Sequence, residues 1–418
     1  MQQQSVVSRM VRSPLTSWVL LAGVLVLILM QAYHPWWRTH LEADIGTFHA
    51  RAVHFLKNGT WAGMEYNEYQ PGALWFFVFV ASFTANFANY DAYLTAIIFI
   101  NVLLIVLHFL LFERFSHRAA PLVFVALVAA AGPILLYRFE LLVSLLTVCA
   151  WVLFRRNRME LAALLTGLAV SIKLYPIVLF PLLVAPSLKA RDWAECFRTS
   201  LFFGIGVLAP VTFAVQFGAT ITDILHGIAV HGLKPVGLEG LWGAVVTALQ
   251  WILSIPLHIT PGFGVHGLTS DLPFLSNTLL NSIWILPTGI VLFCILYVGR
   301  KRGFTDPGYA CLLLLTFLTF SKVVNPQYLW WATAFIPLMP VSWFGRETRK
   351  MIVFIVLACL LVTQIVYPLY YTEFLKWYDG ASDTSPFLFT IMAIRNVVMV
   401  ALVVIGTERL FHLPKTAA

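Results

Sequence analysis

The sequence predicts an all-α protein that crosses a membrane many times. Of its 418 residues 60% are hydrophobic and only 11% are charged, and the mean hydropathy is +0.84. A chain with so few polar side chains cannot coat a soluble globule of this size. Apolar segments of membrane-spanning length recur from end to end, with no polar block of domain size between them. We therefore expect one integral-membrane domain over residues 1–418.

Short basic clusters between the apolar segments predict how the chain threads the membrane. Such clusters gather on the cytoplasmic side, which also accounts for the net charge of +8 without a nucleic-acid partner. If every apolar run crossed, several clusters would lie on the wrong side. Two runs are therefore expected not to cross: 71–87, which starts at Pro71-Gly72, is aromatic-rich and is short for a span, and 241–258, whose flanks are rich in Gly, Pro and His. The clusters are Arg9/Arg12, Arg114/His117/Arg118, Arg155/Arg156/Arg158, Lys189/Arg191, Arg300/Lys301/Arg302, Arg346/Arg349/Lys350 and Arg409/Lys415.

The remaining apolar runs predict about twelve crossings, with both termini in the cytoplasm. The first run has no small-residue cleavage site after it, so we expect a retained helix rather than a signal peptide. Several central runs have roughly 14 residues and reach only about 21 Å, which suggests a thin, water-accessible wall. The expected crossings are 17–33, 93–112, 119–136, 141–154, 159–173, 176–188, 198–216, 283–299, 307–320, 328–343, 351–369 and 387–405.

Two long loops, 34–92 and 217–282, are expected on the outer side, and the first is unusually rich in ionisable side chains. Between residues 40 and 57 the spacing is helical, and His40, Asp44 and Arg51 share one face. A carboxylate between cations and beside apolar surface stays ionised while partly desolvated, as a general base requires. Asp44 is therefore a candidate base. The alternative is a solvated helix with ordinary surface charges.

Lys173 interrupts an apolar run and is expected at the outer end of a short helix, just before Pro176 turns the chain back. A lysine there could simply extend its ammonium group to the interface. Other polar groups fall on the same predicted side, where ionisable residues are costly unless they line a polar cavity. Their gathering predicts a site whose cations could hold a phosphate, although single basic residues also contact lipid headgroups. These groups are Arg138, Glu140, Tyr175, His226, His231, Lys234, Glu239, Lys322, Asn325 and Gln327.

The sequence indicates neither a metal site nor a cofactor. The pairs His49/His54 and His226/His231 are spaced five residues apart, which places the two rings about 140° apart on a helix. The five cysteines form no CxxC pair. There is no P-loop, no GxSxG motif and no dinucleotide-binding fingerprint. We therefore expect no metal and no cofactor.

Several short motifs occur in an order that resembles a known family. After Asp44 come EYQPG (68–72), RFE (138–140), KLYP (173–176), HGLKPVGLEGLWGA (231–244), SK (321–322) and PQY (326–328). Together they resemble the polyprenyl-phosphate-sugar-dependent glycosyltransferases of the C-type fold, most closely glycosyltransferase family 87, which includes bacterial mannosyltransferases. The resemblance implies a C-type helix bundle with interfacial helices at its periplasmic face.

The resemblance also implies a reaction and roles for the site residues. A hexose, with mannose as the family's best example, would pass with inversion from a polyprenyl-phosphate donor to a hydroxyl of a lipid-linked or glycan acceptor. Asp44 would take the hydroxyl proton. The donor phosphate would bind Lys173, Lys234, Lys322 and Arg138. The substrates would also contact Glu68, Tyr69, Glu140, Tyr175, His231, Glu239 and Gln327.

The expected location is a plasma membrane, by the resemblance a bacterial inner membrane, with the active site on the outer face. The expected partners are the lipid-linked donor, the acceptor and membrane lipids, and no nucleic acid. A secondary transporter or lipid flippase is the main alternative. Transporters tend to show internal repeats and polar residues near the bilayer midplane, whereas this sequence shows no repeat and its polar residues gather at one face. A membrane scaffold would leave the crowded first loop unexplained.

Overall fold

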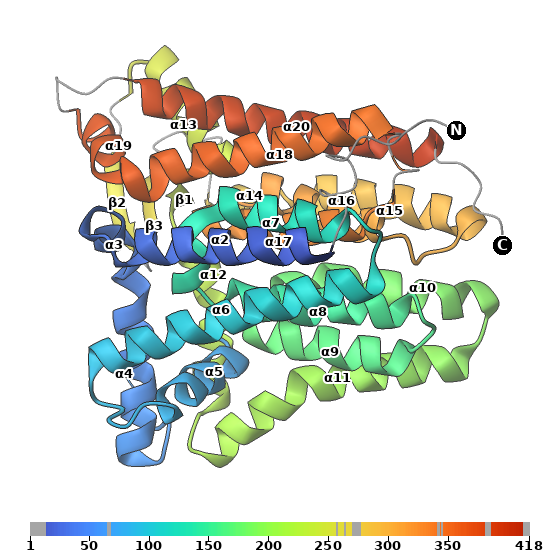
Figure 1. Cartoon of the computed structure of the whole chain (residues 1–418), viewed down its shortest axis with the longest axis horizontal. Helices are drawn as coiled ribbons and strands as arrows, with labels where there is room; N and C mark the ends of the chain where they lie inside the picture. The colour runs from blue at the N-terminus through green and yellow to red at the C-terminus, as the bar shows by residue number, and fades with distance from the viewer. Residues whose placement is uncertain are drawn as a thin grey trace.

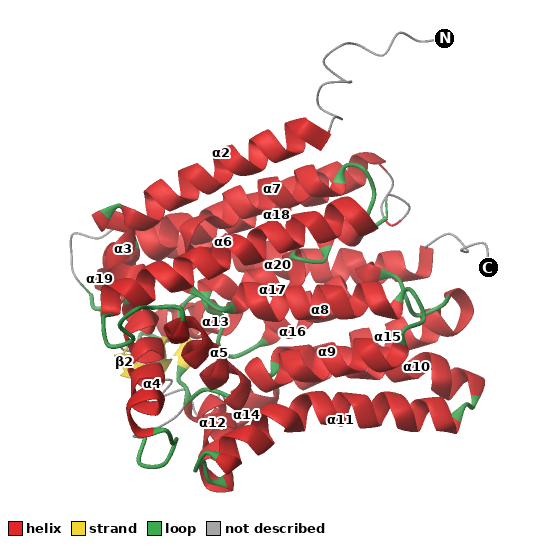
Figure 2. Cartoon of the chain, turned by 60° about the horizontal axis from the view of Figure 1, so that its bottom comes forward, coloured by secondary structure: helices red, strands yellow, loops and turns green. Residues whose placement is uncertain are grey.

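A computed structural model describes most of the chain and shows a helix bundle with one small sheet at one end (Figures 1 and 2). The all-α polytopic fold is thereby confirmed. Among the described residues seven helical segments are long and apolar enough to cross a membrane. The described residues are 14–64, 68–255, 258–262, 265–269, 277–340, 343, 346–380 and 386–412, so Glu65 of the first loop lies outside them.

The seven long segments agree with predicted crossings. Their apolar side chains face both the bundle interior and its outer surface, as expected of helices in lipid. The segments are α2 (Pro14–Tyr33), α6 (Tyr90–Phe115), α7 (Ala120–Ala131) with the 3₁₀ turn η1 (Gly132–Tyr137), α11 (Trp193–Gln216), α14 (Asn277–Ser282) with α15 (Ile285–Arg302), α18 (Arg346–Gln364) with the π-turn η6 (Ile365–Leu369), and α20 (Phe387–His412).

Shorter apolar helices match four of the other predicted crossings. They are α8 (Glu140–Phe154), α9 (Met159–Ile172), η2 (Tyr175–Leu179) with α10 (Phe180–Ala190), and α16 (Pro307–Phe320). The number of crossings, about twelve, stays a prediction. The prediction of one helix over 328–343 was wrong, because prolines divide this segment. It forms η3 (Pro326–Tyr328), α17 (Leu329–Thr333) and η4 (Ile336–Leu338).

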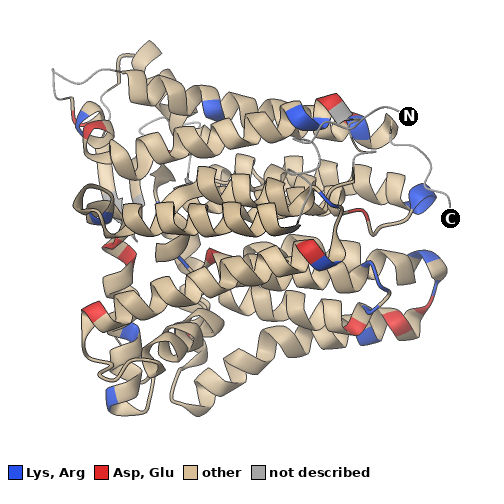
Figure 3. Cartoon of the chain, in the orientation of Figure 1, with Lys and Arg blue, Asp and Glu red and all other residues tan. Residues whose placement is uncertain are grey.

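The bundle has two distinct ends, which we call the sheet end and the terminal end. The terminal end is where α2 begins and α20 ends, and the described basic clusters between the long helices lie there (Figures 1 and 3). At the sheet end lie α5 (Pro71–Ser82) and α13 (Leu241–Ile252), the two runs predicted not to cross. Each has 12 residues and is about 18 Å long.

The second long loop contains structure that the sequence did not indicate. After α12 (Ile221–Leu233), three antiparallel strands pair in the order β1-β3-β2. The strands are β1 (Val236–Gly237), β2 (His258–Gly262) and β3 (Val265–Thr269). They are short and contain Gly, Pro and His, so no alternation of apolar and polar residues marked them.

The first part of the first long loop, where helical spacing was predicted over 40–57, forms two helices. The helix α3 (Pro35–Leu41) ends at Glu42, and α4 (Ala43–Asn58) begins directly after it. The break changes the direction of the chain between His40 and Asp44. The helix α19 (Tyr371–Tyr378) follows η6 at the same end of the bundle (Figure 1), and its residue Thr372 lies 3.0 Å from His40 of α3.

Glycines bring α9 and α11 into close contact. A Cβ atom added to Gly206 would lie 2.3 Å from the carbonyl oxygen of Leu164, and one added to Gly167 would lie 2.2 Å from that of Phe203. Close approach through small residues is a common way for membrane helices to associate. The helix α11 also contains Gly204, where an added Cβ atom would meet nothing within 4 Å.

We expect Gly206→Ala to lower thermal stability and Gly204→Ala to leave it unchanged or slightly higher. Both substitutions improve helix propensity by about 1 kcal/mol. Only Gly206→Ala forces the backbones of α9 and α11 apart, and such overpacking lowers the free energy of unfolding by about 1–3 kcal/mol. Thermal unfolding of the two purified variants in one detergent measures the difference, and equal melting temperatures would contradict the close packing of α9 on α11.

Candidate active site

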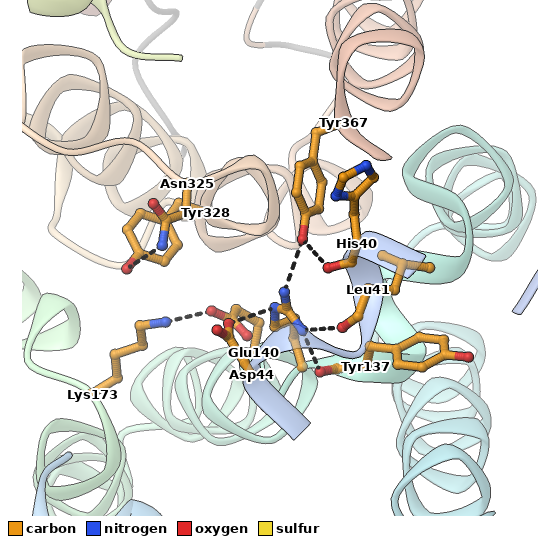
Figure 4. A network of polar contacts seen from close by, with 10 residues as sticks. His40, Leu41, Asp44, Tyr137, Glu140, Lys173, Asn325, Tyr328 and Tyr367 are labelled. Atoms are coloured by element: carbon orange, nitrogen blue, oxygen red, sulfur yellow. Dashed lines mark hydrogen bonds and ion pairs between the residues drawn. The ribbon is translucent and has the colours of Figure 1, made fainter. Parts of the chain in front are cut away.

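Three carboxylate–cation pairs lie together at the sheet end of the bundle. They come from segments far apart in sequence and are wholly or largely buried, which is how charged groups are tolerated beside an apolar bundle. Three of the six side chains are labelled in Figure 4. The pairs are Asp44 with Arg138 at 3.2 Å, Glu140 with Lys173, and Glu68 with Lys234 at 3.7 Å.

Asp44 lies in the first turn of α4, where a carboxylate interacts favourably with the positive end of the helix dipole. Its side chain keeps 28% of its surface exposed, so the carboxylate remains reachable. The sequence placed it between His40 and Arg51, but the cation beside it is Arg138. Because the helix breaks at Glu42, the His40 ring turns away and lies 3.0 Å from the hydroxyl of Thr372.

The Arg138 guanidinium is buried and already has protein partners on several sides. It donates to the carbonyl oxygens of Leu41 at 2.8 Å and Tyr137 at 3.0 Å, and to the hydroxyl of Tyr367 at 3.1 Å (Figure 4). These contacts leave Arg138 little capacity for a phosphate. Its geometry fits the positioning of Asp44 better than the phosphate contact expected from the resemblance.

Lys173 turns inward instead of extending to the membrane interface. It caps the C-terminal end of α9 and pairs with Glu140 in the first turn of α8, so both charges also suit the helix dipoles. Its ammonium nitrogen lies 4.3 Å from the ring centre of Tyr328, 4.9 Å from Phe139 and 5.3 Å from Trp331. Burial lowers the pKa of Lys173, and the Glu140 carboxylate opposes that shift.

Lys234 and Lys322 complete the basic side of the site. Burial lowers the pKa of Lys234, with Glu68 opposing the shift, and burial lowers the pKa of Lys322 to about 8. The Lys322 ammonium donates to the carbonyl oxygen of Gly232 at 3.2 Å, and Gly232 precedes Lys234 by two residues in the sequence. Within the part of the chain that the structure describes, Lys322 has no ion-pair partner. Three carboxylates therefore face four cations, and the site has a surplus of one positive charge.

The other predicted residues fall into two groups. Tyr69 and His231 belong to the cluster: the Tyr69 ring packs on Phe48, and burial together with Lys234 and Lys173 lowers the pKa of His231 to about 4. Tyr175 lies beside the pair of Glu140 and Lys173, whereas Gln327 and Glu239 lie apart from the three pairs. The Tyr175 ring is buried and stacks on Trp331 at 4.1 Å, behind Lys173.

Gln327 and Glu239 lie near two tyrosines that sequence reasoning missed. Gln327 lines a small cavity together with Tyr367, and Glu239 accepts a hydrogen bond from the Tyr371 hydroxyl at 2.8 Å. No signal could have identified these tyrosines, because Tyr367 ends an ordinary apolar run and Tyr371 begins a loop segment of unremarkable composition.

The histidine pair His49/His54 has ordinary partners. The Nε2 atom of His49 lies 2.9 Å from the carbonyl oxygen of Phe87, and that of His54 lies 3.1 Å from the carbonyl oxygen of Ala62. Among the described residues, no group of three or more His, Cys, Asp or Glu side chains is arranged to hold a metal ion.

Comparison with known proteins gives one curated relative and one family match. GPI mannosyltransferase 1 of Gibberella zeae is 26% identical to the chain over 214 residues, which are 46% of this chain and 47% of that protein. The match thus spans about half of the relative's length. The profile of glycosyltransferase family 87 matches residues 67–326, more than half of the chain, and this stretch includes Glu68, Arg138, Lys173, Lys234 and Lys322. This match over more than half of the chain shows that the chain, with its membrane-length apolar helices, belongs to glycosyltransferase family 87.

Proposed function

We propose that the protein transfers a mannosyl group from a polyprenyl-phosphate donor to an acceptor hydroxyl, with Asp44 as the general base. The observation that carries the proposal is a reachable carboxylate beside a buried site with one surplus positive charge. A sugar phosphodiester has one negative charge, which matches that surplus. The name of the fungal relative, a mannosyltransferase, supports mannose as the sugar.

In this mechanism one bond forms and one breaks at the anomeric carbon of the sugar. Asp44 takes the proton of the acceptor hydroxyl, and the oxygen attacks the anomeric carbon from the face opposite the phosphate. The bond from that carbon to the phosphate oxygen breaks with inversion, and polyprenyl phosphate leaves with both electrons. The proton then passes from Asp44 to solvent.

The lysines stabilise the charge that develops on the leaving group. The phosphate gains one negative charge as the bond to the sugar breaks, so fixed cations bind the transition state more strongly than the ground state. Lys322 and Lys234 are best placed for this role, because Lys322 has no carboxylate partner among the described residues and Lys234 lies 3.7 Å from its own. Lys173 is held by Glu140 and contributes a positive potential nearby.

The proposed orientation places the sheet end outside the cytoplasm. The basic clusters of the terminal end then lie inside, as short basic loops do in membrane proteins. The active site lies near one membrane surface, so a lipid-linked donor can bring its sugar phosphate to the lysines while its isoprenoid chain remains in the bilayer. The resemblance of the motifs favours a bacterial inner membrane as the location. The proposed acceptor is a hydroxyl of a lipid-linked compound or a glycan.

We expect Asp44→Asn to fold but to lose most of its transfer activity, by about 10²–10⁴-fold, because the amide cannot accept the proton. The assay is transfer from radiolabelled polyprenyl-phosphate mannose to a panel of lipid and glycan acceptors by the full-length protein in detergent. Asp91→Asn is the matched control, since this carboxylate also lies at the sheet end and is 84% exposed.

Two results would count against the proposal. Full activity in a folded Asp44→Asn variant would exclude Asp44 as the base. If the wild-type protein consumes no polyprenyl-phosphate mannose with any acceptor, the donor assignment itself is wrong.

The pKa of Lys322 predicts an alkaline limit to donor use. The ammonium form binds phosphate and is present below the pKa of about 8, so kcat/KM for the donor should fall as the pH rises through 8. Lys322→Arg should move this fall above pH 10, because a guanidinium stays protonated there. Lys322→Met should raise the donor KM about tenfold or more at pH 7.

Lys376→Arg is the control for this pH profile, since Lys376 lies exposed in α19 at the same end. Its alkaline limit should match that of the wild type. If Lys322→Arg also keeps the wild-type profile, Lys322 does not bind the donor phosphate.

A further inference from the structure

A second polar cluster lies beside Asp44 and contains no lysine. Its first member is Tyr367, whose hydroxyl accepts a hydrogen bond from Arg138 at 3.1 Å and donates one to the carbonyl oxygen of His40 at 2.7 Å. The Tyr367 ring meets the ring of Tyr371 at 4.8 Å. The cluster therefore begins at the same guanidinium that holds Asp44.

The cluster continues from Tyr371 to a buried carboxylate. The Tyr371 hydroxyl donates to Oε1 of Glu239 at 2.8 Å and lies 3.4 Å from Nδ1 of His266. The ring of His40 packs edge-on against Tyr371 at 5.5 Å, and that of His266 does so at 5.7 Å. Both histidines are half-buried, whereas the tyrosine and the carboxylate that they adjoin are buried.

Glu239 is held from the membrane-spanning helix α20. Arg395 is buried in that helix and donates to the backbone carbonyl oxygen of Glu239 and, at 2.9 Å, to the hydroxyl of Thr363. Asn396 donates to the same Glu239 carbonyl at 3.2 Å. Burying an arginine in a membrane-spanning helix costs free energy, and such residues usually serve a function. The hydrogen bonds of Arg395 to the loop therefore indicate that a fixed position of Glu239 is important for function.

One oxygen of Glu239 is buried without a hydrogen-bond donor in the described part of the chain. The Glu239 side chain is 3% exposed, and its Oε2 atom has no hydrogen-bond partner within the described part of the chain. A buried carboxylate oxygen without a donor is unfavourable, and nearly all such atoms in proteins find a partner. Oε2 can therefore accept a hydroxyl from a bound molecule.

Members of the two polar groups lie on opposite sides of Asp44. In Figure 4, Lys173 approaches Asp44 from one side, while Tyr367 and His40 lie on the other. A base that deprotonates the acceptor must contact it, whereas the donor phosphate belongs with the lysines. The charged groups that face the histidines of the second cluster include the carboxylates Glu373 and Asp379, which disfavour a phosphate there.

We propose that the acceptor binds in this second cluster, formed by His40, Tyr367, Tyr371, Glu239 and His266, and that it is a saccharide or another polyol. The inference rests on the proposed function. A polyol offers several hydroxyl donors to Glu239 and the histidines, and the carbon face of its ring packs on the tyrosines. A simple aliphatic alcohol has one hydroxyl, which reaches Asp44 but leaves Glu239 without a donor.

The test uses two acceptors that differ in the polyol alone. The full-length protein in detergent is given radiolabelled polyprenyl-phosphate mannose with octyl α-mannoside or with decanol. The wild type should label octyl mannoside and leave decanol unlabelled. Glu239→Gln should raise the KM for octyl mannoside about tenfold, while the donor KM and the slow hydrolysis of the donor without acceptor stay within about twofold.

Tyr371→Phe is a second variant that keeps the ring and removes only the hydroxyl, and it should raise the acceptor KM without changing the donor KM. Its matched control is Tyr378→Phe in the same helix α19. The hydroxyl that this control removes contacts Thr247, whereas the Tyr371 hydroxyl contacts Glu239. This control should behave as the wild type does.

The outcomes separate this inference from the proposed function. Equal labelling of decanol and octyl mannoside, labelling of neither with donor hydrolysis intact, or an unchanged acceptor KM in both variants would overturn the polyol subsite alone. A protein that neither transfers mannose from the donor nor hydrolyses it would overturn the proposed function.

Discussion

The ion pair between Asp44 and Arg138 is the contact on which the rest of the site depends. Through one buried guanidinium it joins the start of α4, the end of α3 at Leu41, the turn before α8 and the Tyr367 hydroxyl of η6. A buried arginine without its carboxylate would be strongly unfavourable, so the pair fixes four segments at once. It also keeps Asp44 at the boundary between the two polar clusters, which is where a base between donor and acceptor belongs.

The balance of charge around this pair explains how a polar site persists at the end of an apolar bundle. Each carboxylate of the first cluster faces a cation, and each pair limits the cost of burying its two members. The surplus cation, Lys322, is bound by a backbone carbonyl, a weaker partner that a phosphate can replace. In the proposed mechanism the paired groups stabilise the site, and the surplus lysine binds the donor phosphate.

Much of the fold could be predicted from the sequence, because segment length and the placement of basic residues are local signals. The two runs predicted not to cross, from charge, composition and length together, form the short helices α5 and α13. The partner of Asp44 could not be predicted, because helical spacing between His40 and Asp44 could not show the break at Glu42. Helical spacing also could not show that the cation beside Asp44 would be Arg138, almost a hundred residues later in the sequence, instead of His40. Tyr371 was missed for the same reason, since its role depends on contact with Glu239 across the fold.

The most direct measurement is an experimental structure of the full-length protein with polyprenyl phosphate, the proposed product, bound in lipid nanodiscs. We expect the phosphate at the sheet end, with its oxygens about 3 Å from the ammonium groups of Lys322 and Lys234. The Asp44 carboxylate should face the space between that phosphate and Tyr367. A phosphate bound among the basic residues of the terminal end, with the lysines of the sheet end unchanged, would contradict the proposed site.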